Sequence, residues 1–300
     1  MSGLLVLAGP TGTGKSELAV ALAHRLDGEV VNADAMQLYR GMDIGTAKTP
    51  PAGRRGVPHH LMDVLEVTET ASVAMYQQQA RAVIEDLLAA GRMPILVGGS
   101  GLYIQAVIDE MSFPGTDPEV RRRYLQMVAE RGPESLHGEL RSLDPAAAAT
   151  ILPTDGRRIA RALEVREITG KPFTANLPVP GPARYDALIL TLDRPTASLD
   201  ARLAARVDAM MAAGFLDEVR RLLGSGLRQG TTAKRALGYA QLIDVVDGKR
   251  TVEQAITDTV TATRRFVRRQ RSWFRRDPRR HDLDAADPGL LDAALALLRS

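Results

Sequence analysis

One stretch near the N-terminus has the residue types and spacing of a phosphate-binding loop. Residues 9–16 (GPTGTGKS) fit the pattern G-x-x-x-x-G-K-[ST], between an apolar run and a helical pattern. In such a loop, backbone N–H groups converge on phosphate oxygens, the lysine adds a positive charge and the serine hydroxyl coordinates Mg²⁺. ATP, GTP and another diphosphate all fit this motif. The predicted diphosphate-binding residues are Gly9, Pro10, Thr11, Gly12, Thr13, Gly14, Lys15 and Ser16, and Ser16 is also the predicted metal ligand.

Two more polar side chains follow predicted strands. Asp34 comes just after a run that ends at Asn32, and Ser100 lies in a glycine-rich turn, Gly98-Gly-Ser-Gly101. The carboxyl ends of parallel strands form the ligand-binding edge of an open α/β sheet. Three roles fit Asp34: a general base, a group behind Mg²⁺, or the N-cap of the segment 36–39. Ser100 would bring a hydroxyl group to the same edge.

A hydrolytic NTPase would also place a Mg²⁺-binding aspartate directly after an apolar strand. Here the strand predicted at Pro94 to Val97 ends in glycine, and the other candidate, Asp193, lies far along the chain. The ATPase interpretation is therefore weakened.

Arginines gather in two segments that could bind an anionic partner. In the first, Arg157, Arg158 and Arg161 fall in one helical pattern, where Arg158 and Arg161 share a face. In the second, residues 264–280 hold nine arginines and one acid, interleaved with aromatic residues that include Trp273. Positive charge beside aromatic rings is typical of RNA binding. A solvated helix face and ordinary core packing are the respective alternatives.

The elements that must position these residues alternate between strand and helix. Strands are expected at Leu4 to Ala8, Glu29 to Asn32, Leu61 to Val64, Pro94 to Val97 and Ala187 to Leu192, and helices at Lys15 to Leu26 and Ser72 to Ala90. This alternation predicts an α/β fold, a P-loop NTPase-like parallel sheet core with helices on both faces. A long helix should begin at Thr251, with Val252, Ile256, Val260 and Val267 at helical spacing.

The sequence pattern changes between Phe113 and Arg184, where there are no strand-like apolar runs. Two polar helical segments, Pro118 to Arg131 and Thr154 to Thr169, stand there instead. We therefore expect a core of residues 1–112 and 185–300, interrupted by a helical insert domain of residues 113–184.

The composition excludes several classes of protein. With 45% hydrophobic and 25% charged residues the chain is typical of globular proteins. It has no cysteine, which excludes disulfides, thiol nucleophiles and thiolate zinc sites. No apolar run reaches the roughly 18 residues that a membrane span needs. We expect a soluble cytoplasmic protein that does not contact membranes.

Six motifs occur in one order along the chain: residues 9–16, 32–48, 56–63, 98–103, 158–165 and 269–276. In this order the sequence closely resembles the tRNA dimethylallyltransferases, also called tRNA isopentenyltransferases, from residue 3 to about 277. The resemblance implies transfer of a dimethylallyl group from dimethylallyl diphosphate to N6 of the adenine 3′-adjacent to the anticodon, in tRNAs reading codons that begin with U. It also implies a monomer.

Roles for individual residues follow from the resemblance. Asp34 takes the N6 proton, Lys15, Ser16 and Mg²⁺ stabilise the departing diphosphate, and Ser100 and Arg158 are further donors near it. The adenine is flipped out of the anticodon loop to reach the site. Residues implied to contact tRNA are Asp34, Ala35, Met36, Gln37, Ser100, Arg121, Arg157, Arg158, Ile159, Ala160, Arg161, Arg268, Arg269, Arg271 and Trp273.

Three positions depart from the family pattern, namely Ser100 and Ser272 in place of threonine and Ala240 in place of lysine. They affect the expected RNA affinity rather than the reaction. A P-loop small-molecule or nucleoside monophosphate kinase is the main rival, but it leaves the arginines of residues 264–280 unexplained. A non-enzymatic RNA-binding protein leaves Lys15, Ser16 and Asp34 without a role.

Overall fold

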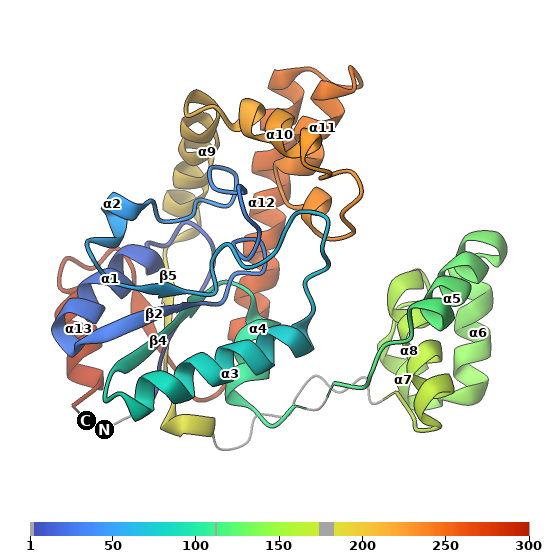
Figure 1. Cartoon of the computed structure of the whole chain (residues 1–300), viewed down its shortest axis with the longest axis horizontal. Coiled ribbons are helices and arrows are strands. Elements are labelled where there is room, and N and C mark those ends of the chain that lie inside the picture. Colours follow the sequence, from blue (N-terminus) through green and yellow to red (C-terminus); the bar gives the residue numbers. More distant parts are fainter. Residues whose placement is uncertain (1–2, 112, 174–182, 300) are drawn as a thin grey trace. The chain divides into compact units, whose positions relative to one another are not determined.

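The computed structural model describes residues 3–111, 113–173 and 183–299 of the 300-residue chain. The chain divides into two compact units (Figure 1). The first comprises Met1–Glu110 and Pro180–Ser300, and the second comprises Met111–Val179. Residues 174–182, which belong to the predicted insert, lie outside the described residues.

The first unit is built on a six-stranded sheet in the order β3-β2-β4-β1-β5-β6, with every pairing parallel. The predicted α/β fold is therefore confirmed. Central strand β1 aligns Leu5 with Ile95 on one side and with Leu188 on the other. The strands are β1 Leu5–Ala8, β2 Gly28–Asn32, β3 His59–His60, β4 Met93–Gly98, β5 Leu188–Asp193 and β6 Arg280–Asp284.

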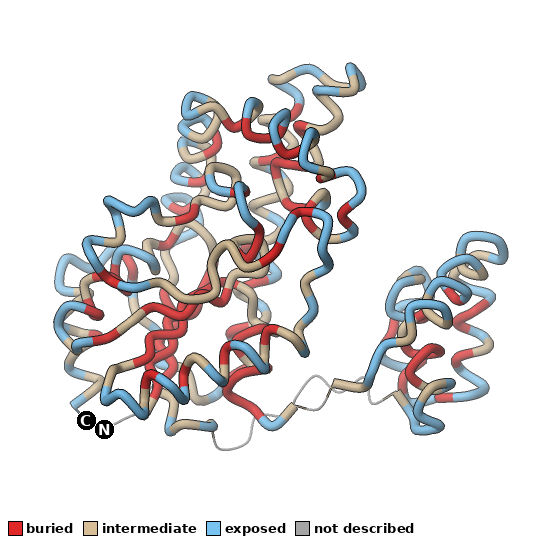
Figure 2. Tube along the Cα trace, in the orientation of Figure 1, coloured by how far each residue is buried: buried red, intermediate tan, exposed pale blue. Residues whose placement is uncertain are grey.

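Both faces of the sheet are covered because its strands are apolar on both sides. Leu5 and Leu7 pack on one face with α1 and α13. Leu4, Val6 and Ala8 pack on the other face with α3, α4, α10, α11 and α12. Figure 2 shows buried residues concentrated along the strands. The helices are α1 Lys15–Leu26, α2 Pro51–Arg54, α3 Val73–Ala89, α4 Gly101–Ile108, α9 Thr196–Ala212, α10 Phe215–Gly224, α11 Tyr239–Val246, α12 Val252–Phe274 and α13 Leu290–Leu297, with 3₁₀ turns η1 Arg184–Asp186 and η2 Ala233–Arg235.

The described elements of the second unit are all helices: α5 Pro118–Arg131, α6 Pro133–Leu143, α7 Pro145–Thr150 and α8 Gly156–Thr169. They enclose a separate apolar core that includes Leu136, Leu140 and Leu163. Aspartate side chains begin three of these helices: Asp117 accepts the N–H of Val120, Asp144 that of Ala147 and Asp155 that of Arg158.

Two strand boundaries differ from the sequence prediction. The strand expected at Leu61 to Val64 is wrong: β3 occupies only His59–His60, and Leu61 (φ 58°) and Asp63 (φ 56°) have left-handed backbone that cannot continue a strand. Edge strand β6 was not predicted, because its sequence RHDLD is too polar to show an apolar pattern.

Within the described parts of the chain, no helix is both long and apolar enough to cross a bilayer.

Candidate active site

The predicted phosphate-binding loop joins β1 to α1 as expected. Gly9 has φ 135°, and a Cβ there would lie 2.2 Å from the carbonyl oxygen of Leu192, so only glycine lets the loop pass β5. Gly14 is the N-cap of α1 in the left-handed region (φ 97°), with no side chain capping the helix. The hydroxyl of Thr13 donates to the Pro10 carbonyl at 3.0 Å and fixes the turn. The N-terminal N–H groups of α1 are thus left for an anion.

Lys15 is the cation of this loop. Its Nζ donates to the Pro10 carbonyl at 2.7 Å. Burial and, to a smaller extent, Arg206 lower the pKa of the Lys15 ammonium to about 8, against the opposing effect of the Asp34 carboxylate. The serine that follows, Ser16, is exposed at the start of α1.

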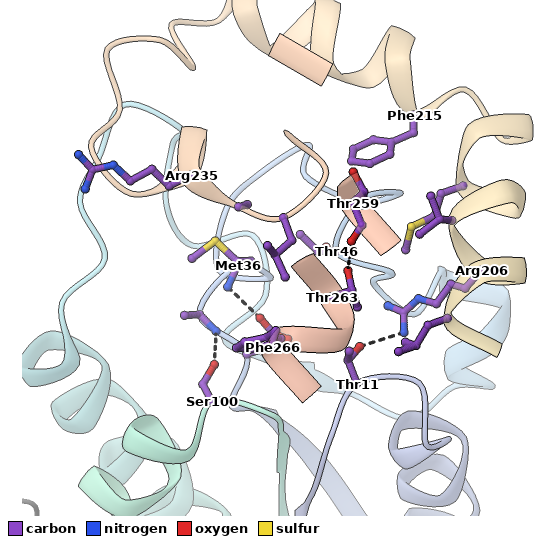
Figure 3. Close-up of a pocket in the computed structure, with 18 of the residues that line it drawn as sticks. Thr11, Met36, Thr46, Ser100, Arg206, Phe215, Arg235, Thr259, Thr263 and Phe266 are labelled. Carbon is purple, nitrogen blue, oxygen red and sulfur yellow. Dashed lines mark hydrogen bonds between the residues drawn. The ribbon is translucent and has the colours of Figure 1, made fainter. Parts of the chain in front are cut away.

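Two arginines of α9 complete the positive charge around the loop, and the sequence analysis did not select them. Arg206 Nη1 donates to the hydroxyl of Thr11 at 3.1 Å, and Arg202 Nε donates to the carbonyl of Gly12 at 3.2 Å (Figure 3 shows the Arg206 contact). Burial lowers the pKa of Arg206, while Asp34 raises it. Their four-residue spacing on the helix after β5 was the available signal.

Asp34 lies where β2 ends, close to this cationic group. Its Oδ1 accepts the N–H of Met36 at 2.9 Å, and residues 35–38 form a turn rather than a helix. Asp34 therefore shapes the turn, as the N-cap alternative anticipated, although no helix follows. The Asn32 side chain fixes the backbone here, accepting the Asp34 N–H at 3.0 Å.

Ser100 reaches the same turn from the end of β4. Its Oγ accepts the N–H of Ala35 at 3.2 Å, which brings the hydroxyl beside Asp34 (Figure 3). A Cβ on Gly98 would lie 2.1 Å from the carbonyl oxygen of Ala33, so the two strand ends meet closely. Gln37, also in the turn, donates its Nε2 to the carbonyl of Thr46 at 3.1 Å.

Gln270 of α12 ties the phosphate-binding loop to the turn after β4. It is 5% exposed; its Oε1 accepts the N–H of Thr11 at 3.1 Å, and its Nε2 donates to the Gly99 carbonyl at 2.9 Å. This residue was also not predicted, because a single glutamine in an arginine-rich helix carries no pattern.

Two cavities meet at this cluster. A polar cavity of about 610 Å³ follows the phosphate-binding loop and is lined by Lys15, Ser16 and Arg202, among others. An apolar cavity of about 390 Å³ extends between α9, α10 and α12 and is lined by Phe215 and Phe266, among others (Figure 3). The residues that line both cavities are Thr11, Asp34, Thr46 and Arg206. Two ligands that meet at Asp34 could thus occupy different surroundings, one cationic and one apolar.

The predicted RNA-binding arginines of α12 separate into two groups. Arg269 is exposed, lines the apolar cavity and lies 5.7 Å from the centre of the Phe266 ring. Arg268 is exposed on another groove that Arg275 and Arg276 also line. None of these four arginines forms a salt bridge among the residues that the structure describes.

Arg271 and Trp273 make structural contacts instead. Arg271 is paired with Asp193, its Nη2 lying 2.8 Å from the carboxylate, and also donates to the Arg194 carbonyl. Asp193, the distant candidate for a Mg²⁺-binding aspartate, therefore forms an ion pair with Arg271. Trp273 is half-buried against the sheet core, and its indole fills the space beside Gly101.

The remaining predicted contacts lie in the second unit. Arg157 and Arg158 are exposed on α8 and form no ion pair within the described ranges. Arg121 and Arg161 both pair with the fully buried carboxylate of Glu164, at 2.8 and 2.9 Å. Their neighbours Ile159 (0% exposed) and Ala160 (1%) lie in this unit's core, so their side chains face away from solvent. The roles assigned to these six residues stay predictions.

Comparison with known proteins points to one family. The family model described as IPP transferase matches residues 37–277. The chain is 58% identical to the tRNA dimethylallyltransferase of Nocardia farcinica, over 98% of this chain and 94% of that protein. It is 61% identical to that of Saccharopolyspora erythraea, over 98% of this chain and 95% of the relative.

Solved structures agree with this result. A full-length tRNA isopentenylpyrophosphate transferase from Bacillus halodurans is 36% identical, with a TM-score of 0.70 and 99% of each chain covered. A eukaryotic dimethylallyltransferase solved acting on tRNA is 29% identical, with a TM-score of 0.82 over 99% of this chain and 77% of that one.

Proposed function

Because this chain belongs to the IPP transferase family, whose curated members are tRNA dimethylallyltransferases, we propose that it joins dimethylallyl diphosphate to N6 of an adenine in tRNA. At the level of the family the activity is plain: the protein is a prenyltransferase that transfers a dimethylallyl group to tRNA. The finer proposal names the adenine 3′-adjacent to the anticodon, in tRNAs reading codons that begin with U, with diphosphate as the second product.

A single observation carries this proposal: Asp34 lines both the polar and the apolar cavity. A donor whose diphosphate lies against the phosphate-binding loop can extend its carbon chain past Asp34. An adenine in the apolar cavity can then bring N6 to the same carboxylate. A transfer between two dissimilar substrates needs such a shared boundary, because the reacting atoms must approach to about 3–3.5 Å.

The polar cavity suits the diphosphate. The N-terminus of α1, Lys15, Arg202 and Arg206 supply convergent donors and positive charge. As the C1–O bond of the donor breaks, negative charge grows on the leaving diphosphate, and these groups stabilise it there.

The residues present also fit Mg²⁺. This ion is usually held by one or two protein oxygens together with substrate phosphates. Ser16 and Asp34 both line the polar cavity and supply a hydroxyl and a carboxylate. When bound, Mg²⁺ neutralises charge on the diphosphate. We propose that Ser16 holds it.

The acceptor step requires a base, because the lone pair of adenine N6 is delocalised into the ring. Asp34 Oδ1 is occupied by the Met36 N–H, whereas Oδ2 has no hydrogen bond to any described residue and can take a proton. The N6–C1 bond forms, the C1–O bond breaks and the N6 proton passes to Asp34. Among the described residues, the Ser100 hydroxyl accepts the Ala35 N–H and donates to no other group, which leaves its own hydrogen free to orient the adenine.

The RNA itself would be held by exposed arginines. Arg269 stands at the apolar cavity, and Arg268, Arg275 and Arg276 line the neighbouring groove. We propose that these groups bind phosphates of the anticodon arm, with Arg157 and Arg158 as contacts from the second unit. The kinase alternative, which predicts no RNA partner, is not favoured.

The test is transfer of label from dimethylallyl diphosphate to an unmodified anticodon stem-loop in the presence of Mg²⁺. Label should enter the RNA, disappear when the target adenine is replaced by guanine, and fall when the metal is chelated. Phosphate transfer from ATP to a small acceptor, with no label in RNA, would refute the proposal.

We further propose that the enzyme acts as a monomer in the cytoplasm. Light scattering of the active fraction at working concentration would reveal a dimer.

A further inference from the structure

Glu218 of α10 is a buried carboxylate that the reaction described above does not use. It is 1% exposed, and no lysine, arginine or histidine pairs with it among the described residues. Burial of a charged or polar group without partners is costly, so its hydrogen bonds must compensate. Among the described residues, the hydrogen bonds to Glu218 come from the loop of residues 43–45 and from Tyr239.

Three consecutive backbone N–H groups converge on this carboxylate. Oε2 accepts the N–H groups of Asp43 and Ile44, at 3.1 and 2.8 Å, and Oε1 accepts that of Gly45 at 3.2 Å. The hydroxyl of Tyr239 also donates to Oε1. Burial, together with the Glu218 charge, raises the pKa of Tyr239, so the phenol stays a donor. One side chain thus satisfies four donors.

The anchored loop forms a wall of the apolar cavity. Gly45 and the next residue, Thr46, line this cavity together with Phe215, which begins α10 (Figure 3 labels Thr46 and Phe215). The loop lies close to the helix: a Cβ on Gly45 would lie 2.2 Å from the Phe215 ring and 2.5 Å from that of Tyr239. The carbonyl of Thr46 also accepts a hydrogen bond from the Nε2 of Gln37, which lies in the turn that begins at Asp34.

We propose that Glu218 is a positioning residue, which fixes the loop of residues 43–46 and thereby the shape of the cavity that receives the acceptor. This inference rests on the proposed function. Glu218 does not reach the reacting atoms: it acts through the backbone of Asp43 to Gly45, and the loop acts through Thr46 and Gln37. Removing the carboxylate should therefore impair use of the RNA more than binding of the diphosphate.

Glu218→Gln tests this with little change in volume. The amide offers one acceptor oxygen and one NH₂ group, so it cannot serve both the Asp43–Ile44 pair and Gly45. Amide hydrogen exchange should accelerate at residues 43–45 by about 10- to 100-fold, while exchange in α1 stays unchanged. The kcat/KM for RNA should fall about tenfold or more, whereas inhibition by inorganic diphosphate should change less than about twofold.

Asp217→Asn is the matched control. Asp217 neighbours Glu218 on α10, but its side chain is 65% exposed, and its ion pair among the described residues is with Arg220. This variant should keep wild-type exchange at residues 43–45 and wild-type kinetics. Tyr239→Phe keeps the three backbone hydrogen bonds and should leave exchange of the loop nearly unchanged.

If Glu218→Gln does not fold, Gly45→Ala displaces the loop from the other side with Glu218 intact, because its Cβ would collide with Phe215. The same fall in kcat/KM for RNA is expected. Wild-type exchange at residues 43–45 in Glu218→Gln, or unchanged kcat/KM for RNA, would overturn the inference. If wild-type protein fails to transfer dimethylallyl groups, the proposed function is wrong, and the exchange measurement still decides whether Glu218 anchors the loop.

Discussion

The polar and apolar cavities share Asp34 but are constructed differently. Six of the residues that line the polar cavity lie in one short segment, residues 11–17, which includes Lys15. The residues that line the apolar cavity come mainly from residues 34–46, α9, α10, residues 235–237 and α12. The polar cavity thus contains one segment that is local in sequence, whereas the apolar cavity depends throughout on the tertiary structure.

The largest effect is expected where the two cavities meet. Asp34→Asn retains an oxygen for the Met36 N–H but removes the base, so kcat should fall by about 10²- to 10⁴-fold. Inhibition by inorganic diphosphate should persist, because that cavity keeps its cations. Asp208→Asn, at an exposed position on α9, is the control. Transfer at a near wild-type rate with saturating RNA would show that Asp34 is not the base.

Within the polar cavity, the two α9 arginines should differ. Arg206 is half-buried and contacts Thr11, whereas Arg202 is exposed and contacts the Gly12 carbonyl. Arg206→Gln should lower kcat/KM for the donor by about 100-fold, and Arg202→Gln by about tenfold or less, because solvent screens the exposed charge. Steady-state kinetics with varied donor would check this order. Equal losses of kcat/KM in Arg206→Gln and Arg202→Gln would mean that the difference in burial between the two arginines does not affect use of the donor.

Lys15 should make diphosphate binding depend on pH. Since the pKa of Lys15 is lowered to about 8, the ammonium is charged below this pH and loses its proton above it. The ratio of wild-type affinity to that of Lys15→Met at the same pH cancels the titration of the diphosphate itself; this ratio should be constant below about pH 8 and fall above it, by up to about tenfold per pH unit. A ratio that does not change with pH would assign the pH dependence of binding to another group.

The smallest effect should distinguish an arginine that binds RNA, Arg269, from one that makes structural contacts, Arg271. Arg269→Gln should reduce the salt slope of RNA binding by about 0.7 to 0.9, as expected for one lost phosphate contact. Arg271→Gln should leave the slope unchanged and lower the thermal midpoint, because Arg271 pairs with Asp193. Fluorescence titrations at several salt concentrations would decide. A reduced slope for Arg271→Gln would restore its predicted role in RNA binding.

Sequence patterns predicted the elements around the phosphate-binding loop well, because their signals are short in range. The strand before the loop and the helix after it follow from local spacing, and both are confirmed. Asp34 could be placed at the strand edge for the same reason. Arg206 and Gln270 could not, because their contacts with Thr11 depend on how distant helices pack.

Helix α12 shows where periodicity misleads. The stripe predicted at Val252, Ile256 and Val260 is only half-buried, while Ala255 and Thr259 are buried. Thr259 lines the apolar cavity. This polar residue is therefore buried because it faces the cavity, not because it belongs to the hydrophobic core. Val267, in contrast, is buried as predicted. Hydrophobic patterns describe packing, and they fail on a face that receives a ligand.

The supports of the phosphate-binding loop have a consequence for the order in which the protein matures during synthesis. The loop occupies residues 9–16, yet Gly9 packs on the Leu192 carbonyl and the Thr11 N–H is held by Gln270, 259 positions later. A nascent chain that carries the whole motif but not these later residues therefore lacks the contacts that shape it. The ribosome must deliver β5 and then α12 before these contacts can form, so the loop reaches its final shape only after residue 270 has been translated.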